Sequence, residues 1–227
     1  METTLHPIAK MHSDFPTKFG IPRQAGLAES LISTIIFEPE YRNPEALRGL
    51  EDFSHLWLIW HFSETERGQW SPTVRPPRLG GNKRMGVFAT RSPFRPNPLG
   101  LSCVKILGID ETANEGTVIH VAGADLMDGT PIFDIKPYVP YSDAHPDALG
   151  GFTATAGDFL LKVDFPDSLI VKIPEDKRVA LMEVLSHDPR PSYQRSSERV
   201  YGLPFAGFDI RFTVSDSILQ VQEVVRL

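Results

Sequence analysis

The sequence predicts a mainly β protein, with a closed or nearly closed β-barrel domain followed by a small α+β C-terminal domain. Three observations lead to this prediction. Apolar and polar residues alternate with a period of two through the first two-thirds of the chain, which is typical of strands with one buried face. Only one short helix is expected among these strands, and closure of the sheet would remove its unpaired edges. After residue 160 the pattern changes to strands mixed with one amphipathic helix.

The barrel strands are expected where β-branched and aromatic residues alternate between turn-forming residues. The short helix is expected from Asn43 to Gly49, because Asn43 is a good N-cap, Pro44 suits the first turn and Gly49 suits the end. Asp128-Gly129 lies between the last two strands and predicts a β-hairpin there. The six expected strands are Leu5–Met11, Ser30–Phe37, His55–Phe62, Leu99–Ile109, Thr117–Leu126 and Ile132–Tyr138.

The domain boundaries are expected where this periodicity is lost. Residues 140–160 are rich in small residues and turn formers. We therefore expect a barrel domain over 1–145, a linker over 146–160 and a C-terminal domain over 161–227. The elements expected in the last domain are a strand over Leu160–Phe165, a helix over Pro174–Ser186, and a hairpin of Ile210–Val214 with Ile218–Val224.

Composition excludes several protein classes. Of the 227 residues, 41% are hydrophobic and 23% are charged, which excludes a fibrous or wholly disordered chain. The single Cys103 forms no internal disulfide and is expected to be a buried thiol. No stretch is apolar enough to span a membrane and the first residues lack a signal-peptide pattern, so a cytoplasmic protein is expected. The histidines lack metal-ligand spacing, and no metal is expected.

Basic charge is concentrated in one part of the chain. The net charge is −6, yet residues 67–95 contain seven Lys or Arg and no Asp or Glu. Within this stretch we expect two Arg-bearing loops, stiffened by Pro, on either side of a short strand over Val87–Thr90. Guanidinium groups suit phosphates and stack on bases, so the stretch indicates nucleic acid or another phosphate as a ligand. A solvated cationic loop is the alternative.

Three other segments contain polar residues with a possible chemical role. Asn97-Pro98 ends the basic stretch, and the Asn97 side-chain carbonyl could accept a hydrogen bond from an exocyclic amine, although Asn-Pro also initiates ordinary turns. Asp134, Lys136 and Tyr138 share one face of a strand, as an active-site wall or as an ion pair at the barrel rim. The loop over residues 19–26 fits no phosphate-binding fingerprint, so any cofactor is expected outside a Rossmann frame.

Five separated blocks of the sequence resemble one known family. They are KFGIPRQAG, RGLEDFSHLWLIWHF, RPPRLGGNKRMGVFATRSPFRPNPLGLS, DLMDGTPIFDIKPYVPY and HDPRPSYQ. Together they resemble the TsaA-like, or TrmO-like, family of S-adenosylmethionine-dependent tRNA methyltransferases. The resemblance implies a β-barrel catalytic domain, a small C-terminal domain and a homodimer. It also implies methylation of N6 of threonylcarbamoyladenosine next to the anticodon in threonine-type tRNAs.

The resemblance also implies roles for individual residues. Relatives often have a His-Gln pair where this chain has Ser63-Glu64. The implied cofactor-binding residues are Arg23, Gln24, Ala25, Gly26, Ser63, Glu64, Arg91, Leu101, Asp125, Leu126, Met127, Asp128, Gly129 and Thr130. The residues expected to hold the phosphates of the tRNA anticodon stem-loop are Arg75, Arg78, Lys83, Arg84, Arg95, Lys136, Arg190 and Arg195.

The implied reaction would be helped by a base or a strong hydrogen-bond acceptor near N6. A carbamoyl substituent makes the N6–H more acidic than that of a plain amine, so a nearby base or strong acceptor would make the nitrogen a better nucleophile. The candidates are Asn97, Asp128, Asp134 and Tyr138. A catalytically silent RNA-binding barrel and a protein that senses S-adenosylmethionine without consuming it are the alternatives.

Overall fold

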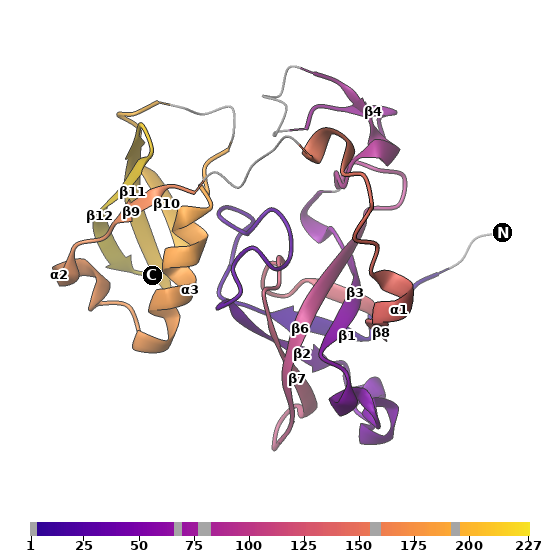
Figure 1. The fold of residues 1–227 in the computed structure, drawn as a ribbon. Coiled ribbons are helices and arrows are strands. Elements are labelled where there is room, and N and C mark those ends of the chain that lie inside the picture. Colours follow the sequence, from indigo (N-terminus) through magenta and orange to yellow (C-terminus); the bar gives the residue numbers. More distant parts are fainter. Residues whose placement is uncertain (1–3, 66–69, 77–82, 155–159, 192–195) are drawn as a thin grey trace.

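Two β-rich units make up the protein (Figure 1). The computed structural model describes residues 4–65, 70–76, 83–154, 160–191 and 196–227. The first unit is a six-stranded antiparallel sheet and the second is a four-stranded sheet with helices. The mainly β class predicted from the sequence is therefore confirmed.

The first sheet runs in the order β1-β2-β7-β6-β3-β8, and β8 pairs in turn with β1 to give a barrel. That last pairing consists of two residue pairs, Ala9 with Ile132 and Lys10 with Pro131. Inward-facing residues alternate with outward-facing ones, as in β3, where Leu56, Leu58 and Trp60 are buried in the barrel core. The strands are β1 (Ala9–His12), β2 (Ile32–Phe37), β3 (His55–His61), β6 (Leu99–Thr112), β7 (Gly116–Ala122) and β8 (Pro131–Pro137).

The predicted hairpin at Asp128-Gly129 is wrong. β7 pairs with β2 and β6, whereas β8 pairs with β1 and β3. The chain leaves β7 at Gly123, where φ is 74°, and Leu126 then enters the barrel core with 1% exposure. The Asp-Gly turn does form, but its backbone bonds to the β1 side of the barrel: Gly129 N donates to Met11 O at 2.8 Å. Burial of Leu126 therefore outweighs the local hairpin preference.

Three local predictions also need correction. The first strand begins at Ala9 and not at Leu5. The helix at Asn43 forms as a 3-10 helix, η2 (Pro44–Leu47), with Asn43 Oδ1 accepting from Glu45 N at 3.0 Å. Val87–Thr90 is no strand: a 3-10 helix, η6 (Val87–Ala89), forms because the Thr90 backbone N–H and hydroxyl both donate to Val87 O. The other short elements of this unit are η1 (Pro39–Tyr41), η3 (Leu50–Asp52), η4 (Ser63–Thr65), β4 (Thr73–Val74), β5 (Met85–Gly86), α1 (Pro140–Asp143) and η7 (Gly151–Thr153).

The C-terminal unit contains the predicted strand, helix and hairpin. Its sheet has the order β10-β11-β12-β9, in which β9 is parallel to β12. β10 is not apparent in the sequence, because its Gly and Pro resemble strand breakers. Pro204 is accommodated because β10 is an edge strand. The elements are β9 (Lys162–Asp164), α2 (Asp167–Ile170), α3 (Glu175–Ser186), β10 (Tyr201–Phe205), β11 (Phe208–Ser215) and β12 (Ile218–Arg226).

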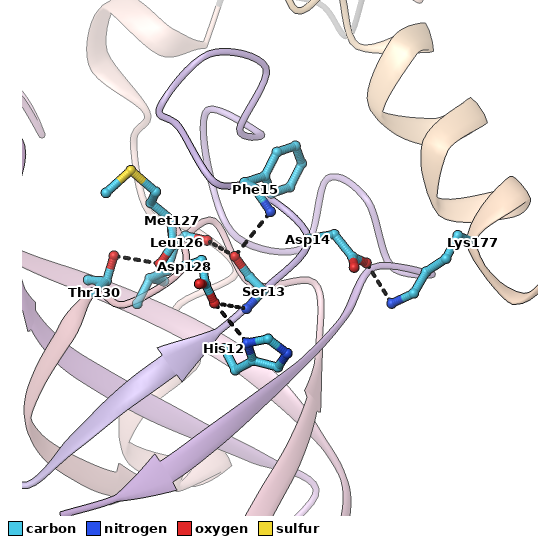
Figure 2. A network of polar contacts seen from close by, with 9 residues as sticks. All are labelled: His12, Ser13, Asp14, Phe15, Leu126, Met127, Asp128, Thr130 and Lys177. Atoms are coloured by element: carbon cyan, nitrogen blue, oxygen red, sulfur yellow. Dashed lines mark hydrogen bonds and ion pairs between the residues drawn. The ribbon is translucent and has the colours of Figure 1, made fainter. Parts of the chain in front are cut away.

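The loop between β1 and β2 joins the two units. Phe15 is fully buried in the core of the C-terminal unit and contacts Phe205 edge to face at 5.4 Å between ring centroids. Asp14 accepts a hydrogen bond from Lys177 Nζ of α3 at 2.7 Å (Figure 2). Further along the loop, the Ser30 hydroxyl donates to Glu183 of the same helix at 2.8 Å. Because this loop also contains residues 23–26, its packing against α3 determines where those residues lie.

Candidate active site

An open cavity of about 1890 Å³ lies where the ends of β3 and β6 meet the basic loops. Pockets for a single small ligand commonly occupy about 300–1,000 Å³, so this cavity has room for a cofactor and part of a second ligand. It is lined by residues 18, 21–24, 60–64, 71, 73–76, 84–85, 88–97, 99–101, 125, 127, 130 and 149–153. Segments far apart in the sequence therefore meet in one place.

A hydrogen-bond chain through the barrel wall holds one carboxylate in this cavity. Trp60 Nε1 donates to Ser102 Oγ at 3.0 Å, and Ser102 Oγ donates to Asp125 Oδ1 at 2.5 Å. Trp60 lies directly across the β3–β6 ladder from Gly100. A Cβ at Gly100 would lie 2.2 Å from the indole ring, so only glycine leaves room for this position of Trp60.

The electrostatics around Asp125 combine burial with nearby donors. Burial raises the pKa of this carboxyl above the ordinary Asp value, while the Ser102 hydroxyl, the Arg91 charge and the Ala25 backbone N–H act in the opposite direction. Asp125 and Arg91 both line the cavity. The cavity therefore offers an anionic and a cationic group to a ligand that has both charges.

The basic loop and the β1–β2 loop are bonded to each other beside Asp125. Arg91 Nη1 donates to Gln24 Oε1 at 2.5 Å, and the Gln24 amide in turn donates to Arg23 O. Arg95 Nη1 donates to Thr90 O at 3.0 Å, which fixes its side chain against its own loop. Gly26 N donates to Gly123 O at 2.8 Å and so ties the β1–β2 loop to the end of β7.

The structure brings together many, but not all, of the residues expected to bind the cofactor. Those that line the cavity are Arg23, Gln24, Ser63, Glu64, Arg91, Leu101, Asp125, Met127 and Thr130. Ala25 and Gly26 lie in the adjoining loop, and Leu126 is buried in the barrel core. Asp128 and Gly129 are exposed at the turn, where Asp128 Oδ1 contacts His12 Nδ1 at 2.8 Å and accepts from Ser13 N at 3.0 Å (Figure 2).

Of the four candidates for a base or hydrogen-bond acceptor at N6, only Asn97 is among the described residues that line the cavity. Asp128 is engaged by His12 and Ser13. Asp134 forms a solvent-exposed ion pair with Lys136 at 3.0 Å. Tyr138 packs beside the Trp57 ring, 5.9 Å between centroids. The contact between Asp134 and Lys136 agrees with the second interpretation of this strand face, an ion pair at the barrel rim, and not with an active-site wall.

Some of the residues expected to hold phosphates line the cavity, and others are bonded elsewhere. Arg75, Arg84 and Arg95 line the cavity, and Lys83 is exposed next to Arg84. Lys136 lies in the ion pair with Asp134. Arg190 is 11% exposed and donates from Nε and Nη2 to Asp188 at 2.8 and 2.9 Å, which raises its pKa and leaves it little access to a phosphate. Arg78 and Arg195 lie outside the described residues.

Sequence reasoning missed Ser102, Trp60 and the segment 149–153. Ser102 is 2% exposed at an inward-facing position of β6, and a hydroxyl at such a position of an otherwise apolar face was the available signal. Residues 149–153 line the cavity although they fall within the expected linker.

Comparisons with known proteins identify the family. Residues 10–144 match the model described as the tRNA-methyltransferase O N-terminal domain, and residues 160–227 match the TrmO C-terminal domain. The chain belongs to the TrmO family. The tRNA (adenine(37)-N6)-methyltransferase of Escherichia coli K12 is 40% identical over 222 residues, which cover 94% of each chain. The mouse protein of the same name is 41% identical over 140 residues, 61% of this chain and 31% of that one.

Solved structures agree with this assignment to the TrmO family. A crystal structure of TrmO from Pseudomonas aeruginosa superposes with a TM-score of 0.81 at 32% identity and covers 100% of this chain and 98% of that one. Within the part of the chain that the structure describes, no helix is long and apolar enough to cross a membrane. Within that same part, no three His, Cys, Asp or Glu side chains gather as metal ligands.

Proposed function

We propose that this chain is an S-adenosylmethionine-dependent tRNA methyltransferase that methylates N6 of adenosine 37, the activity named for its E. coli relative. The observation that supports this most is the single cavity lined by Asp125, Arg91 and Asn97. A methyl donor and a nucleotide have to be held side by side for transfer, and a cavity of about 1890 Å³ has room for both.

The cavity residues fit the cofactor. S-adenosylmethionine, when bound, supplies a methyl group on a positively charged sulfur, and it also has an amino group and a carboxylate. The Asp125 carboxylate suits its positive groups and the Arg91 guanidinium suits its carboxylate. Gln24, Leu101, Met127 and Thr130 complete the proposed cofactor surface. The hydrogen bond from Ser102 to Asp125 keeps this carboxylate in place.

The role proposed for Asn97 is to orient the nucleotide. Its side-chain carbonyl accepts the N6–H and so holds the nitrogen toward the donor. We propose threonylcarbamoyladenosine in threonine-type tRNAs as the substrate, as membership of the TrmO family implies. The threonylcarbamoyl substituent makes the N6 hydrogen more acidic, which favours its hydrogen bond to Asn97. Arg75, Lys83, Arg84 and Arg95 hold the phosphates of the anticodon stem-loop in this proposal.

We also infer a cytoplasmic homodimer. Leu101 is 53% exposed on β6 and also lines the cavity, so a second copy packed over this position would complete one wall of the site. Light scattering of the purified chain at several concentrations tests the dimer, and a constant monomer mass would contradict it.

Nucleoside mass spectrometry tests the proposed reaction. Purified protein, S-adenosylmethionine and tRNA that contains threonylcarbamoyladenosine are expected to yield the N6-methylated nucleoside. If this product is absent while tRNA binds, the chain is an RNA-binding barrel; if only the cofactor binds, it is a sensor. Arg91→Ala is expected to weaken cofactor binding. Arg84→Ala is expected to weaken tRNA binding and to lower the slope of log Kd against log salt concentration by about one.

A further inference from the structure

Two large aromatic side chains are exposed beside the cavity. Phe88 lines the cavity and is 73% exposed, and Trp70 is 51% exposed. Their ring centroids lie 6.3 Å apart with an angle of 30° between the ring planes. Exposed aromatic faces are unfavourable in water, so a pair of them at the mouth of a functional cavity indicates a ligand.

Backbone hydrogen bonds and a buried neighbour fix the segments from which the two rings project. Phe88 lies in the short 3-10 helix η6, next to Val87, which is 1% exposed and anchors the turn. Val87 N donates to Pro72 O at 3.0 Å, next to the β4–β5 ladder in which Thr73 pairs with Gly86. These bonds tie the segment of Trp70 to that of Phe88, at one end of the barrel near the label β4 in Figure 1. Because the backbone of both residues is already ordered, less conformational freedom is lost when a ligand stacks on the rings.

The charges around the rings favour one kind of ligand. Arg84 Nη1 donates to Thr73 Oγ1 at 3.3 Å, which places a guanidinium on the same hairpin. Arg75 and Lys83 are exposed on the two sides of that hairpin, and residues 70–76 and 83–97 contain no Asp or Glu. A flat π face with cations beside it suits a nucleobase with its phosphate, and unpaired bases of RNA loops stack on aromatic side chains.

We propose that Phe88, supported by Trp70, is the platform on which one unpaired base of the tRNA anticodon loop stacks while the neighbouring adenosine enters the cavity. This inference rests on the proposed function, since it assumes that the substrate is an RNA loop. It adds a contact that recognises unpaired bases to the phosphate contacts made by Arg84 and its neighbours. Stacking accepts any base, so Phe88 selects for an open loop and not for a particular sequence.

Fluorescence anisotropy tests the platform by measuring the binding of anticodon stem-loop RNA to the full chain at several salt concentrations. Phe88→Ala is expected to raise the Kd by about five- to a hundredfold, whereas Phe88→Tyr keeps the wild-type value. The slope of log Kd against log salt stays unchanged in Phe88→Ala, because no phosphate contact is lost, but it falls by about one in Arg84→Ala. Tyr141→Ala, which removes a 94% exposed aromatic outside the cavity lining, is the matched control and is expected to bind like wild type.

The outcomes separate this inference from the proposed function. Wild-type affinity in Phe88→Ala, while the wild-type chain binds the stem-loop, overturns the platform and leaves the proposed function standing. A loss of dimer in Phe88→Ala, measured by light scattering, also overturns it, because the rings would then contact a second copy of the chain. Failure of the wild-type chain to bind any stem-loop overturns both proposals.

Discussion

Replacement of Ser102 by Ala removes the hydroxyl that links Trp60 to Asp125 and leaves the rest of β6 unchanged. In the wild-type chain this hydroxyl accepts from Trp60 Nε1 at 3.0 Å and donates to Asp125 Oδ1 at 2.5 Å. Ser102→Ala therefore leaves a buried indole N–H without its acceptor and the Asp125 carboxylate without its donor. Both stability and cofactor binding are expected to change.

The magnitudes follow from the two bonds. A neutral hydrogen bond contributes about 1 kcal/mol and a bond to a charged group about 1.5–3 kcal/mol, so the free energy of unfolding is expected to fall by about 3 kcal/mol. The Kd for S-adenosylmethionine is expected to rise about tenfold, which corresponds to about 1.4 kcal/mol. Because the Ser102 hydrogen bond lowers the pKa of Asp125, its loss raises this pKa further. Cofactor affinity should then begin to fall at a higher pH as the solution is acidified.

The assay uses urea unfolding followed by tryptophan fluorescence, together with calorimetry of cofactor binding. The three tryptophans, at positions 57, 60 and 70, all lie in the first unit, so their fluorescence reports on that unit alone. Ser33→Ala is the matched control: Ser33 is also a 2% exposed serine on a barrel strand, but its Oγ has no hydrogen-bond partner among the described residues. If Ser102→Ala unfolds and binds like Ser33→Ala, the hydrogen-bond chain has no role.

Three other substitutions test other parts of the structure. Asp125→Asn is expected to weaken cofactor binding at neutral pH. Because burial raises the pKa of Asp125 above its value in the unfolded chain, the stability that this group contributes at low pH is lost as the pH rises through the raised pKa. Urea unfolding should therefore show that the variant is more stable relative to wild type above that pH than below it. Gly100→Ala is expected to lower the free energy of unfolding by about 1–3 kcal/mol because its Cβ meets the Trp60 ring, and an unchanged urea midpoint would contradict this. Lys177→Met removes the hydrogen bond to Asp14 and is expected to weaken cofactor binding by releasing the β1–β2 loop. If calorimetry gives an unchanged Kd for S-adenosylmethionine, the C-terminal unit does not position that loop.

The sequence predicts the parts of this fold that depend on local patterns. The sequence predicts a strand over His55–Phe62, and β3 spans His55–His61. This prediction depends only on a local pattern, because side chains that alternate along a strand face the core at every second position. The α3 helix follows Pro174 as expected from its periodicity. The basic loop and the segment from Asp125 to Thr130 both reach the cavity, as the sequence and the family resemblance together suggested.

Features that depend on pairing between distant segments were not predictable in this way. Asp128-Gly129 forms a turn, yet the strands on its two sides pair with other strands, because the order of strands in a barrel depends on long-range packing. The environment of Asp125 depends on Ser102 and Trp60, which come from two other parts of the chain. Asp134 and Tyr138 do share a strand face, but alternation alone does not say whether that face meets the cavity or the solvent.

The central claim is that one cavity holds the methyl donor and the target nucleotide together, and site-specific crosslinking tests it most directly. An anticodon stem-loop with a photoreactive group at the target adenosine would be irradiated with the protein in the presence of S-adenosylhomocysteine, and the crosslinked peptides would be mapped by mass spectrometry. Crosslinks are expected within residues 84–101 or 125–130, two segments that supply cavity-lining residues such as Arg91, Asn97 and Asp125. Crosslinks confined to β8 or to the C-terminal unit would contradict the account.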